Sequence, residues 1–98
     1  MLKLKEIVEI NFFSIICKFT NGEVRKLEID KILEAKKEDL YVKKILMPVV
    51  FNSVKIGELG QLYWDNVAQI KDENGILRPC EYDMSPEFVY YNSQLIFH

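Results

Sequence analysis

Hydrophobic and polar residues alternate most regularly between Phe12 and Ile29, on both sides of the pair Asn21-Gly22. Before this pair the apolar side chains fall on one face of an extended chain, and after it the same alternation returns with Leu27 and Ile29. Two alternating runs that flank an Asn-Gly pair are typical of a β-hairpin. The stretch from 12 to 29 is therefore predicted to be the hairpin around which the rest of the chain folds.

The length of the hairpin turn can be chosen from the register. A two-residue loop at Asn21-Gly22 would place Ile15 opposite Glu28, which mixes apolar and polar side chains on both faces. A three-residue loop from Thr20 to Gly22, with Gly22 in the left-handed conformation of a G1 bulge, keeps the apolar side chains together. We expect this three-residue loop, and it pairs Phe13 with Ile29, Ile15 with Leu27 and Cys17 with Arg25.

The segments on either side of the hairpin carry weaker signals. Residues 2 to 10 alternate in the same way and predict a first strand, whose inner face holds Leu2, Leu4, Val8 and Ile10. After the hairpin, Asp30 is a candidate N-cap for a short helix from Lys31 to Ala35, with Ile32 and Leu33 pointing inward.

The middle of the chain is only partly readable. The charged residues 36 to 39 are expected to form a solvated connection. Residues 40 to 47 fit neither the helical nor the strand period, so irregular structure and a strand both remain open. Pro48 favours the first turn of a helix that ends near Asn52. Residues 53 to 56 and 61 to 64 predict a second hairpin, whose core residues are Val54, Ile56, Leu62 and Trp64.

The last third contains a turn-rich stretch and a clear helix start. Lys71 to Pro79 (KDENGILRP) is rich in turn residues and is expected to be an exposed loop or a small protruding hairpin. Ser85 and Pro86 form an N-cap and a first helical position, which predicts a helix from Pro86 to about Asn92. We expect Phe88 to anchor this helix in the core.

Ninety-eight residues are enough for one domain, and 49% hydrophobic with 29% charged residues is an ordinary globular composition. The patterns together predict a single α+β domain, residues 1 to 98, with a mainly antiparallel sheet of about five strands and short helices. The longest apolar run, 45 to 51, is too short to span a membrane, and the first residues lack the pattern of a secretory signal. We expect a cytoplasmic protein without a membrane partner.

Residues that would carry catalysis are sparse. The only histidine is His98, and the two cysteines, Cys17 and Cys80, share no metal-binding or redox spacing. No metal motif or glycine-rich phosphate loop is present, so no catalytic, metal or cofactor site is predicted. An enzyme would require a pocket formed by Cys80, Glu81 and Asp83. Cys17 lies on the apolar face of a predicted strand, where a buried thiol is the simplest interpretation.

Aromatic residues gather in the last third of the chain, where some of them must leave the core. Exposed tyrosines are enriched at protein interfaces because they offer a large contact area at low entropic cost. We therefore predict a protein-binding or self-association surface that contains Tyr82, Tyr90 and Tyr91. The alternative is nucleic-acid binding, which a net charge of −2 does not favour globally, through the local lysines Lys3, Lys5, Lys18, Lys26, Lys36 and Lys37.

The order of signals also resembles a known family. FTNGEVRKLEI is followed by a short helix, by Phe51 and VKI, by GQLYWDN with Ala68 and Ile70, and by the ending CEYDMSPEFVY. Over residues 2 to 90 this order resembles the bacterial family of domain of unknown function 2442. The chain departs from the family by the insertion KDENGILRP and by lacking the helix-turn-helix domain of some relatives. The resemblance implies an α+β domain and an antitoxin-like or accessory partner of a small toxin protein, with no catalytic residues to carry over.

Overall fold

The computed structural model describes residues 1 to 98, which form two antiparallel sheets and five short helices. One sheet has the strand order β1-β2-β3-β7 and the other has the order β4-β5-β6. The strands are β1 (Leu4–Asn11), β2 (Ser14–Phe19), β3 (Val24–Glu28), β4 (Lys55–Ile56), β5 (Leu62–Lys71), β6 (Leu77–Met84) and β7 (Gln94–Phe97). The helices are α1 (Ile29–Ile32), the 3-10 helix η1 (Glu34–Lys36), α2 (Leu40–Ile45), α3 (Pro48–Phe51) and α4 (Pro86–Tyr91). The α+β class is confirmed, with seven strands in two sheets in place of about five in one.

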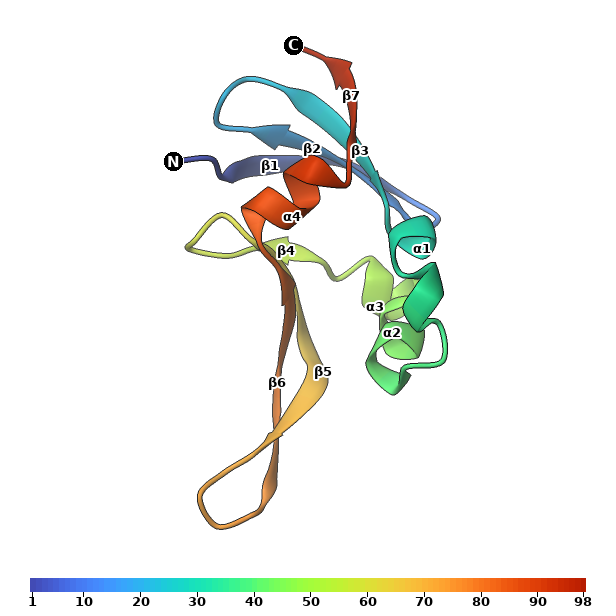
Figure 1. The fold of residues 1–98 in the computed structure, drawn as a ribbon, viewed down its shortest axis with the longest axis vertical. Coiled ribbons are helices and arrows are strands. Elements are labelled where there is room, and N and C mark those ends of the chain that lie inside the picture. Colours follow the sequence, from blue (N-terminus) through green and yellow to red (C-terminus); the bar gives the residue numbers. More distant parts are fainter.

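The molecule is elongated, with principal extents of 48 × 27 × 22 Å. Figure 1 shows the four-stranded sheet at one end, the helices α1 to α3 at one side, and the β5-β6 hairpin extending away to the other end. Helix α4 joins the two sheets, because it follows β6 and leads directly into β7. None of the helices has the length and apolar character that crossing a membrane would require.

The central hairpin has the register expected from the alternation. Ile15 lies opposite Leu27 and Cys17 lies opposite Arg25. The amide of Gly22 donates to the carbonyl of Phe19 at 3.0 Å, and Gly22 has a φ of +88°, so the loop is the three-residue turn with a left-handed glycine. Turn chemistry and a period of two were sufficient to define this element.

The inner face of β1 differs from the prediction. Leu4 is buried and Ile7 and Ile10 pack against the core, whereas Val8 is exposed. The pairing with β2 is shifted between Leu4 and Glu6 and again between Ile7 and Glu9, so β1 contains two bulges. Each bulge adds one residue, which changes the spacing of inward side chains from two to three.

The helical segment that follows β3 begins earlier than predicted. Helix α1 spans Ile29–Ile32, and its N-cap position is Glu28, without a side-chain hydrogen bond. Asp30 is therefore not the cap but a first-turn residue, where a carboxylate still complements the helix dipole. Leu33 is buried as expected, and Ile32 packs against the core.

Residues 40 to 45 form helix α2, which was neither of the two interpretations left open for residues 40 to 47. Asp39 caps it, because its carboxylate accepts hydrogen bonds from the amides of Tyr41 at 2.8 Å and Val42 at 3.3 Å. The fully buried side chains of Val42 and Ile45 then attach α2 to the core. The next helix, α3, starts at Pro48 as predicted and has Asn52 as its C-cap.

The second hairpin is present and continues into a long arm. Its two strands are paired between Lys55 and Tyr63 and between Ile56 and Leu62. Strand β5 then runs on to Lys71 and turns into β6, so the KDENGILRP insertion forms the tip of a protruding hairpin. Asn66, with a φ of +58°, lies in the irregular stretch of β5 between Trp64 and Ala68. Asparagine tolerates this conformation better than most residues.

The core is centred on Trp64, which is fully buried. Its indole nitrogen donates to the carbonyl oxygen of Phe51 at 3.2 Å, so the polar atom of the ring is satisfied. The ring of Phe51 packs edge-on against Phe13 with centroids 5.4 Å apart. Cys17 is buried as predicted, and burial raises the pKa of its thiol to about 12, so the thiol stays protonated at neutral pH.

Candidate protein-interaction surface

The three tyrosines of the predicted surface lie in two different places. Tyr91 is 80% exposed, on α4, and its ring packs edge-on against Tyr90 with centroids 5.5 Å apart. Tyr82 lies in β6, half-buried, with its ring 6.4 Å from that of Trp64. Burial is the first cause that raises the pKa of Tyr82 above its ordinary value. Of the three, Tyr91 is therefore the one that offers most of its surface to a partner.

Helix α4 begins where the sequence predicted. The hydroxyl of Ser85 accepts a hydrogen bond from the amide of Phe88 at 3.1 Å, and Pro86 occupies the first turn. The expectation that Phe88 anchors the helix is wrong, because Phe88 is 40% exposed and Val89 is fully buried. Pro86, Val89 and Tyr90 form the inner stripe at the helical spacing of three and four residues, which leaves Phe88 and Tyr91 on the outer side.

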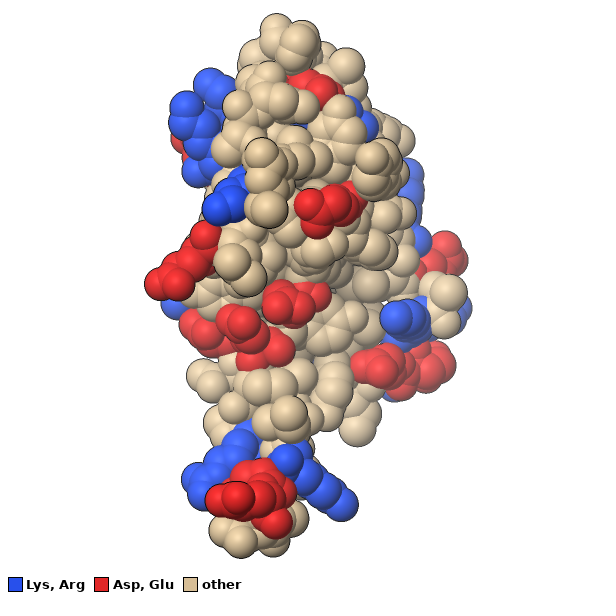
Figure 2. Space-filling model, turned by 60° about the vertical axis from the view of Figure 1, so that its left-hand side comes forward, with Lys and Arg blue, Asp and Glu red and all other residues tan.

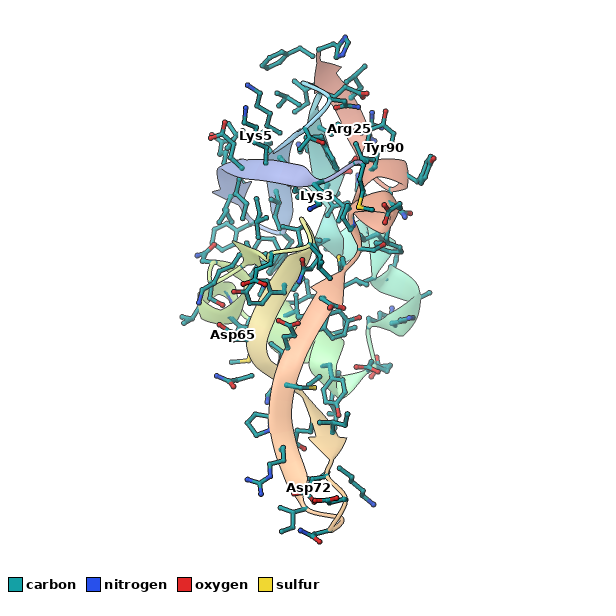
Figure 3. All side chains as sticks on the ribbon, turned by 90° about the vertical axis from the view of Figure 1, so that its left-hand side faces the viewer. Lys3, Lys5, Arg25, Asp65, Asp72 and Tyr90 are labelled. Carbon is teal, nitrogen blue, oxygen red and sulfur yellow. The ribbon has the colours of Figure 1, made fainter.

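A polar network holds α4 and the start of β7 against the central hairpin. Arg25 donates from Nε to the hydroxyl of Ser93 at 2.8 Å and from a terminal nitrogen to the carbonyl oxygen of Ser93 at 2.9 Å. Its other terminal nitrogen pairs with Glu23 at 2.6 Å, and its guanidinium lies 4.2 Å from the centroid of the Tyr90 ring. Figure 3 shows Arg25 and Tyr90 next to each other. The network explains why Tyr90 is half-buried and is not free to bind a partner.

The same network shifts two pKa values. The Tyr90 hydroxyl donates to Glu23 at 2.6 Å, and this hydrogen bond, together with those from Arg25 and Asn21, lowers the pKa of the Glu23 carboxyl below its ordinary 4.5. The hydrogen bond to Glu23 is also the main reason why the pKa of the Tyr90 hydroxyl rises above 10.0, and burial adds to it. At neutral pH the network therefore contains a charged carboxylate and a neutral tyrosine.

Sequence reasoning missed this network and strand β7. Arg25 and Ser93 lie 68 positions apart in the chain, so no local pattern joins them. One signal was present, because the predicted register placed Arg25 beside Cys17 on the inner face of the hairpin. An arginine on an inner face requires partners that satisfy its donors. Strand β7 was missed because its short apolar run carries no turn signal of its own.

Strand β7 has the composition of a central strand but lies at an edge of its sheet. All four of its residues, Gln94–Phe97, are exposed, and none is charged. Leu95 lies opposite Arg25 and Phe97 lies opposite Val24. Since Val24 and Arg25 are neighbours in a strand and point to opposite faces, β7 presents apolar side chains to both faces of the sheet.

Helix α4 and β7 together expose five large apolar residues, which we call the C-terminal surface. Only Asn92 and Ser93 separate the two elements, and Arg25 fixes the position of Ser93. Uncharged atoms dominate the end of the molecule where β7 lies (Figure 2). The members and their exposed fractions are Phe88 40%, Tyr91 80%, Leu95 54%, Ile96 47% and Phe97 62%.

The three residues that were considered for an enzyme pocket, Cys80, Glu81 and Asp83, are divided between the two faces of β6. Cys80 and Tyr82 point to one side of the strand and Glu81 and Asp83 point to the other. Asp83 lines an open pocket of about 650 Å³, Glu81 lines a separate depression of about 360 Å³, and Cys80 lines neither. No group of three or more His, Cys, Asp or Glu side chains is arranged to hold a metal ion. The structure does not bring the three residues together.

The lysines considered for nucleic-acid binding do not form one basic patch. Lys18 lies opposite Glu6 in the first sheet, and Lys26 lies in β3 two positions before Glu28. Lys36 and Lys37 lie at the end of η1, in the helical part of the chain. Lys3 and Lys5 lie at the start of β1, apart from the hairpin tip that carries Asp72 (Figure 3).

Comparison with known proteins adds no relative to this description. No protein-family model matches the chain, and no curated protein or solved structure matches it.

Proposed function

We propose that this chain is a non-enzymatic interaction module that binds another protein through its C-terminal surface. The observation that carries the proposal is the exposure of five large apolar residues on two consecutive elements, α4 and β7. Exposed apolar side chains are ordinary when they are scattered, but a set that includes three aromatics and an uncharged sheet edge is typical of an interaction site. The resemblance to family 2442 supplies the partner class, a small toxin-like protein for which this chain acts as an antitoxin or accessory protein.

Tyr91 is the residue that we expect to contribute most to binding. Its ring is largely exposed, yet the edge-on contact with Tyr90 holds it in place, and Tyr90 is in turn fixed by Glu23 and Arg25. A rigid, amphipathic side chain loses little entropy when it is buried by a partner. Such aromatic residues are common among those that dominate binding energies.

The proposal is tested by producing the chain together with the protein encoded beside it and measuring their association. Tyr91→Ala should weaken binding by about tenfold or more, as expected for an interface aromatic, and leave the melting temperature nearly unchanged. Leu59→Ala is the matched control, because Leu59 is also largely exposed but lies in the β4-β5 turn. Tyr90→Ala should instead destabilise the fold, since Tyr90 belongs to the polar network. A neighbouring protein that stays unbound and active at micromolar excess of this chain would overturn the proposal.

A further inference from the structure

We infer that β7 pairs with β7 of a second copy of this chain, which joins two four-stranded sheets into one sheet of eight strands around a two-fold axis. The inference rests on the proposed function, because it assigns an occupant to the β7 part of the C-terminal surface. The outer edge of β7 has no strand beside it in the order β1-β2-β3-β7. Its backbone amides and carbonyls on that side are therefore available to a further strand.

The composition of β7 favours pairing with itself. Its four residues carry no charge, so an antiparallel copy brings no like charges together. On the neighbouring strand β3, Arg25 is neutralised by Glu23 at 2.6 Å and Glu28 is neutralised by Lys31 at 3.1 Å, which leaves Lys26. In the eight-stranded sheet the two copies of Lys26 would be separated by three strand spacings, about 14 Å. That distance exceeds the Debye length of about 8 Å at physiological salt, so their repulsion is screened.

The other edge of the same sheet explains why assembly would stop at two copies. Strand β1 contains two bulges and the exposed charges Lys5, Glu6 and Glu9. The amide of Leu4 is already bonded to the carbonyl oxygen of Gly60 at 3.1 Å. Bulges, charges and coverage are the features by which sheet edges resist further pairing. In a two-fold dimer, β7 of each copy covers the open edge of the other copy. The joined sheet then ends at a protected β1 strand on each side.

The size of the interface sets the expected affinity. An aromatic side chain carries roughly 150 to 250 Å², so the exposed parts of Phe97, Leu95 and Ile96 on β7 amount to on the order of 300 Å² per copy. The total of about 600 Å² lies below the roughly 1,200 to 2,000 Å² of stable complexes. We therefore expect a reversible dimer with a dissociation constant on the order of 10 to 100 μM.

Two bulge residues provide a matched pair of substitutions. Ile96 lies between the paired positions Leu95 and Phe97 of β7 and is 47% exposed, and Val8 lies between Ile7 and Glu9 of β1 and is 53% exposed. Neither has a partner of its own in the ladder, so a lysine at either position should leave the pairing within the chain intact. Ile96→Lys places a charge on the edge that we assign to the dimer, and Val8→Lys places the same charge on the opposite edge.

The test is sedimentation equilibrium of the purified chain from about 1 to 500 μM. The average mass of the unchanged chain should rise from 11.6 kDa toward twice that value as the concentration increases. Ile96→Lys should remain at the monomer mass over the whole range with an unchanged circular dichroism spectrum, and Val8→Lys should behave as the unchanged chain. An unchanged chain that stays monomeric throughout, an Ile96→Lys variant that associates equally well, or a Val8→Lys variant that loses association would each overturn the inference.

Hydrogen exchange of the unchanged chain provides a second measurement that needs no variant. In the dimer the outward amides of β7 become hydrogen-bonded, so their exchange should slow at high concentration while that of β1 amides stays the same. Protection in β7 that does not depend on concentration contradicts the dimer, even if Ile96→Lys fails to fold. If the chain is monomeric but Tyr91→Ala weakens binding to the neighbouring protein, the dimer fails and the proposed function stands. If the dimer forms but no neighbouring protein binds, the dimer stands and the proposed function fails.

Discussion

The two edge strands of the four-stranded sheet, β1 and β7, are built in opposite ways. Strand β1 is attached by apolar side chains that point into the core, and its free side carries charges, bulges and a covering turn. Strand β7 has no buried residue and is attached to β3 mainly by its ladder and by the Arg25 network at its base. The difference shows that β1 ends the sheet, whereas β7 leaves it open to a further strand.

Gly60 contributes to the closure of the β1 edge. It has a φ of +76°, and a Cβ atom at this position would lie 2.4 Å from Cβ of Lys3. The turn between β4 and β5 can therefore approach β1 closely enough for the Gly60 carbonyl oxygen to accept the hydrogen bond from Leu4. No comparable segment approaches the outer side of β7 in the strand order of the sheet.

The largest expected contrast between the two edges is in the free energy of unfolding. Leu4→Ala should lower it by about 3 kcal/mol, because Leu4 is buried and its loss leaves a cavity. Leu95→Ala should lower it by less than about 1 kcal/mol, because more than half of the Leu95 side chain is already exposed. Urea denaturation near 1 μM protein, where association is negligible, measures both. Equal losses would mean that β7 belongs to the core as much as β1 does.

The next contrast concerns the polar attachment of β7. Arg25→Met should lower the free energy of unfolding by about 2 kcal/mol, because it leaves the Glu23 carboxylate without its cation and Ser93 without its donors. Lys5→Met on the exposed side of β1 is the control, with an expected change below about 0.5 kcal/mol. Hydrogen exchange should show faster opening of β7 in Arg25→Met and unchanged protection in β1. A loss of protection that is uniform over both strands would contradict the assigned role of Arg25.

A smaller effect on the free energy of unfolding is expected at α4, the helix that precedes β7. Ser85→Ala removes the hydroxyl that accepts from the Phe88 amide and should lower the free energy of unfolding by about 1 kcal/mol. Ser85→Asp should retain most of the stability, because a carboxylate can accept the same hydrogen bond and also complements the helix dipole. Thermal denaturation of the unchanged chain, Ser85→Ala and Ser85→Asp measures these differences in stability. If Ser85→Asp were as unstable as Ser85→Ala, the cap would not be the cause.

The sequence predicted those parts of the fold whose structure is determined by residues within one short stretch of the chain. Alternation and the Asn21-Gly22 turn gave the register of the central hairpin, and Ser85-Pro86 gave the start of α4. The phase of β1 could not be derived in this way, because its two bulges exist only in the pairing with β2. The outward position of Phe88 has the same origin, since the face of a short helix that becomes buried depends on what it packs against.

The candidate site was less predictable than the fold. Tyr91 belonged to the predicted surface and is exposed, whereas Tyr90 is held in a network that spans 67 and 68 positions of the chain. Strand β7 offers four residues of pattern, which is too few to separate a strand from a chain end. Long-range hydrogen bonds and the position of a strand within its sheet are properties of the assembled fold.

The smallest expected effect concerns acid, which should loosen the attachment of β7. The Tyr90 hydroxyl and Arg25 hold the pKa of Glu23 below 4.5 in the folded chain, so the folded state favours the charged carboxylate. The stabilisation is therefore fully present above about pH 4.5 and is lost as the pH falls through the lowered pKa. Urea denaturation between pH 7 and pH 3 should show a smaller loss of stability in Glu23→Gln than in the unchanged chain, because glutamine cannot be protonated in this range.

Tyr90→Phe separates this titration from other acidic groups, because it removes the hydrogen bond that is the main cause of the Glu23 shift and leaves the carboxylate in place. Its loss of stability in acid should lie between those of the unchanged chain and Glu23→Gln. The same variant should remove a loss at high pH, because the pKa of Tyr90 is raised in the folded chain: the stabilisation from its neutral hydroxyl is fully present below about pH 10 and is lost as the pH rises through the raised pKa. Identical pH profiles for all three proteins would show that the network does not control the attachment of β7, and the contrast with β1 would then depend on the ladder alone.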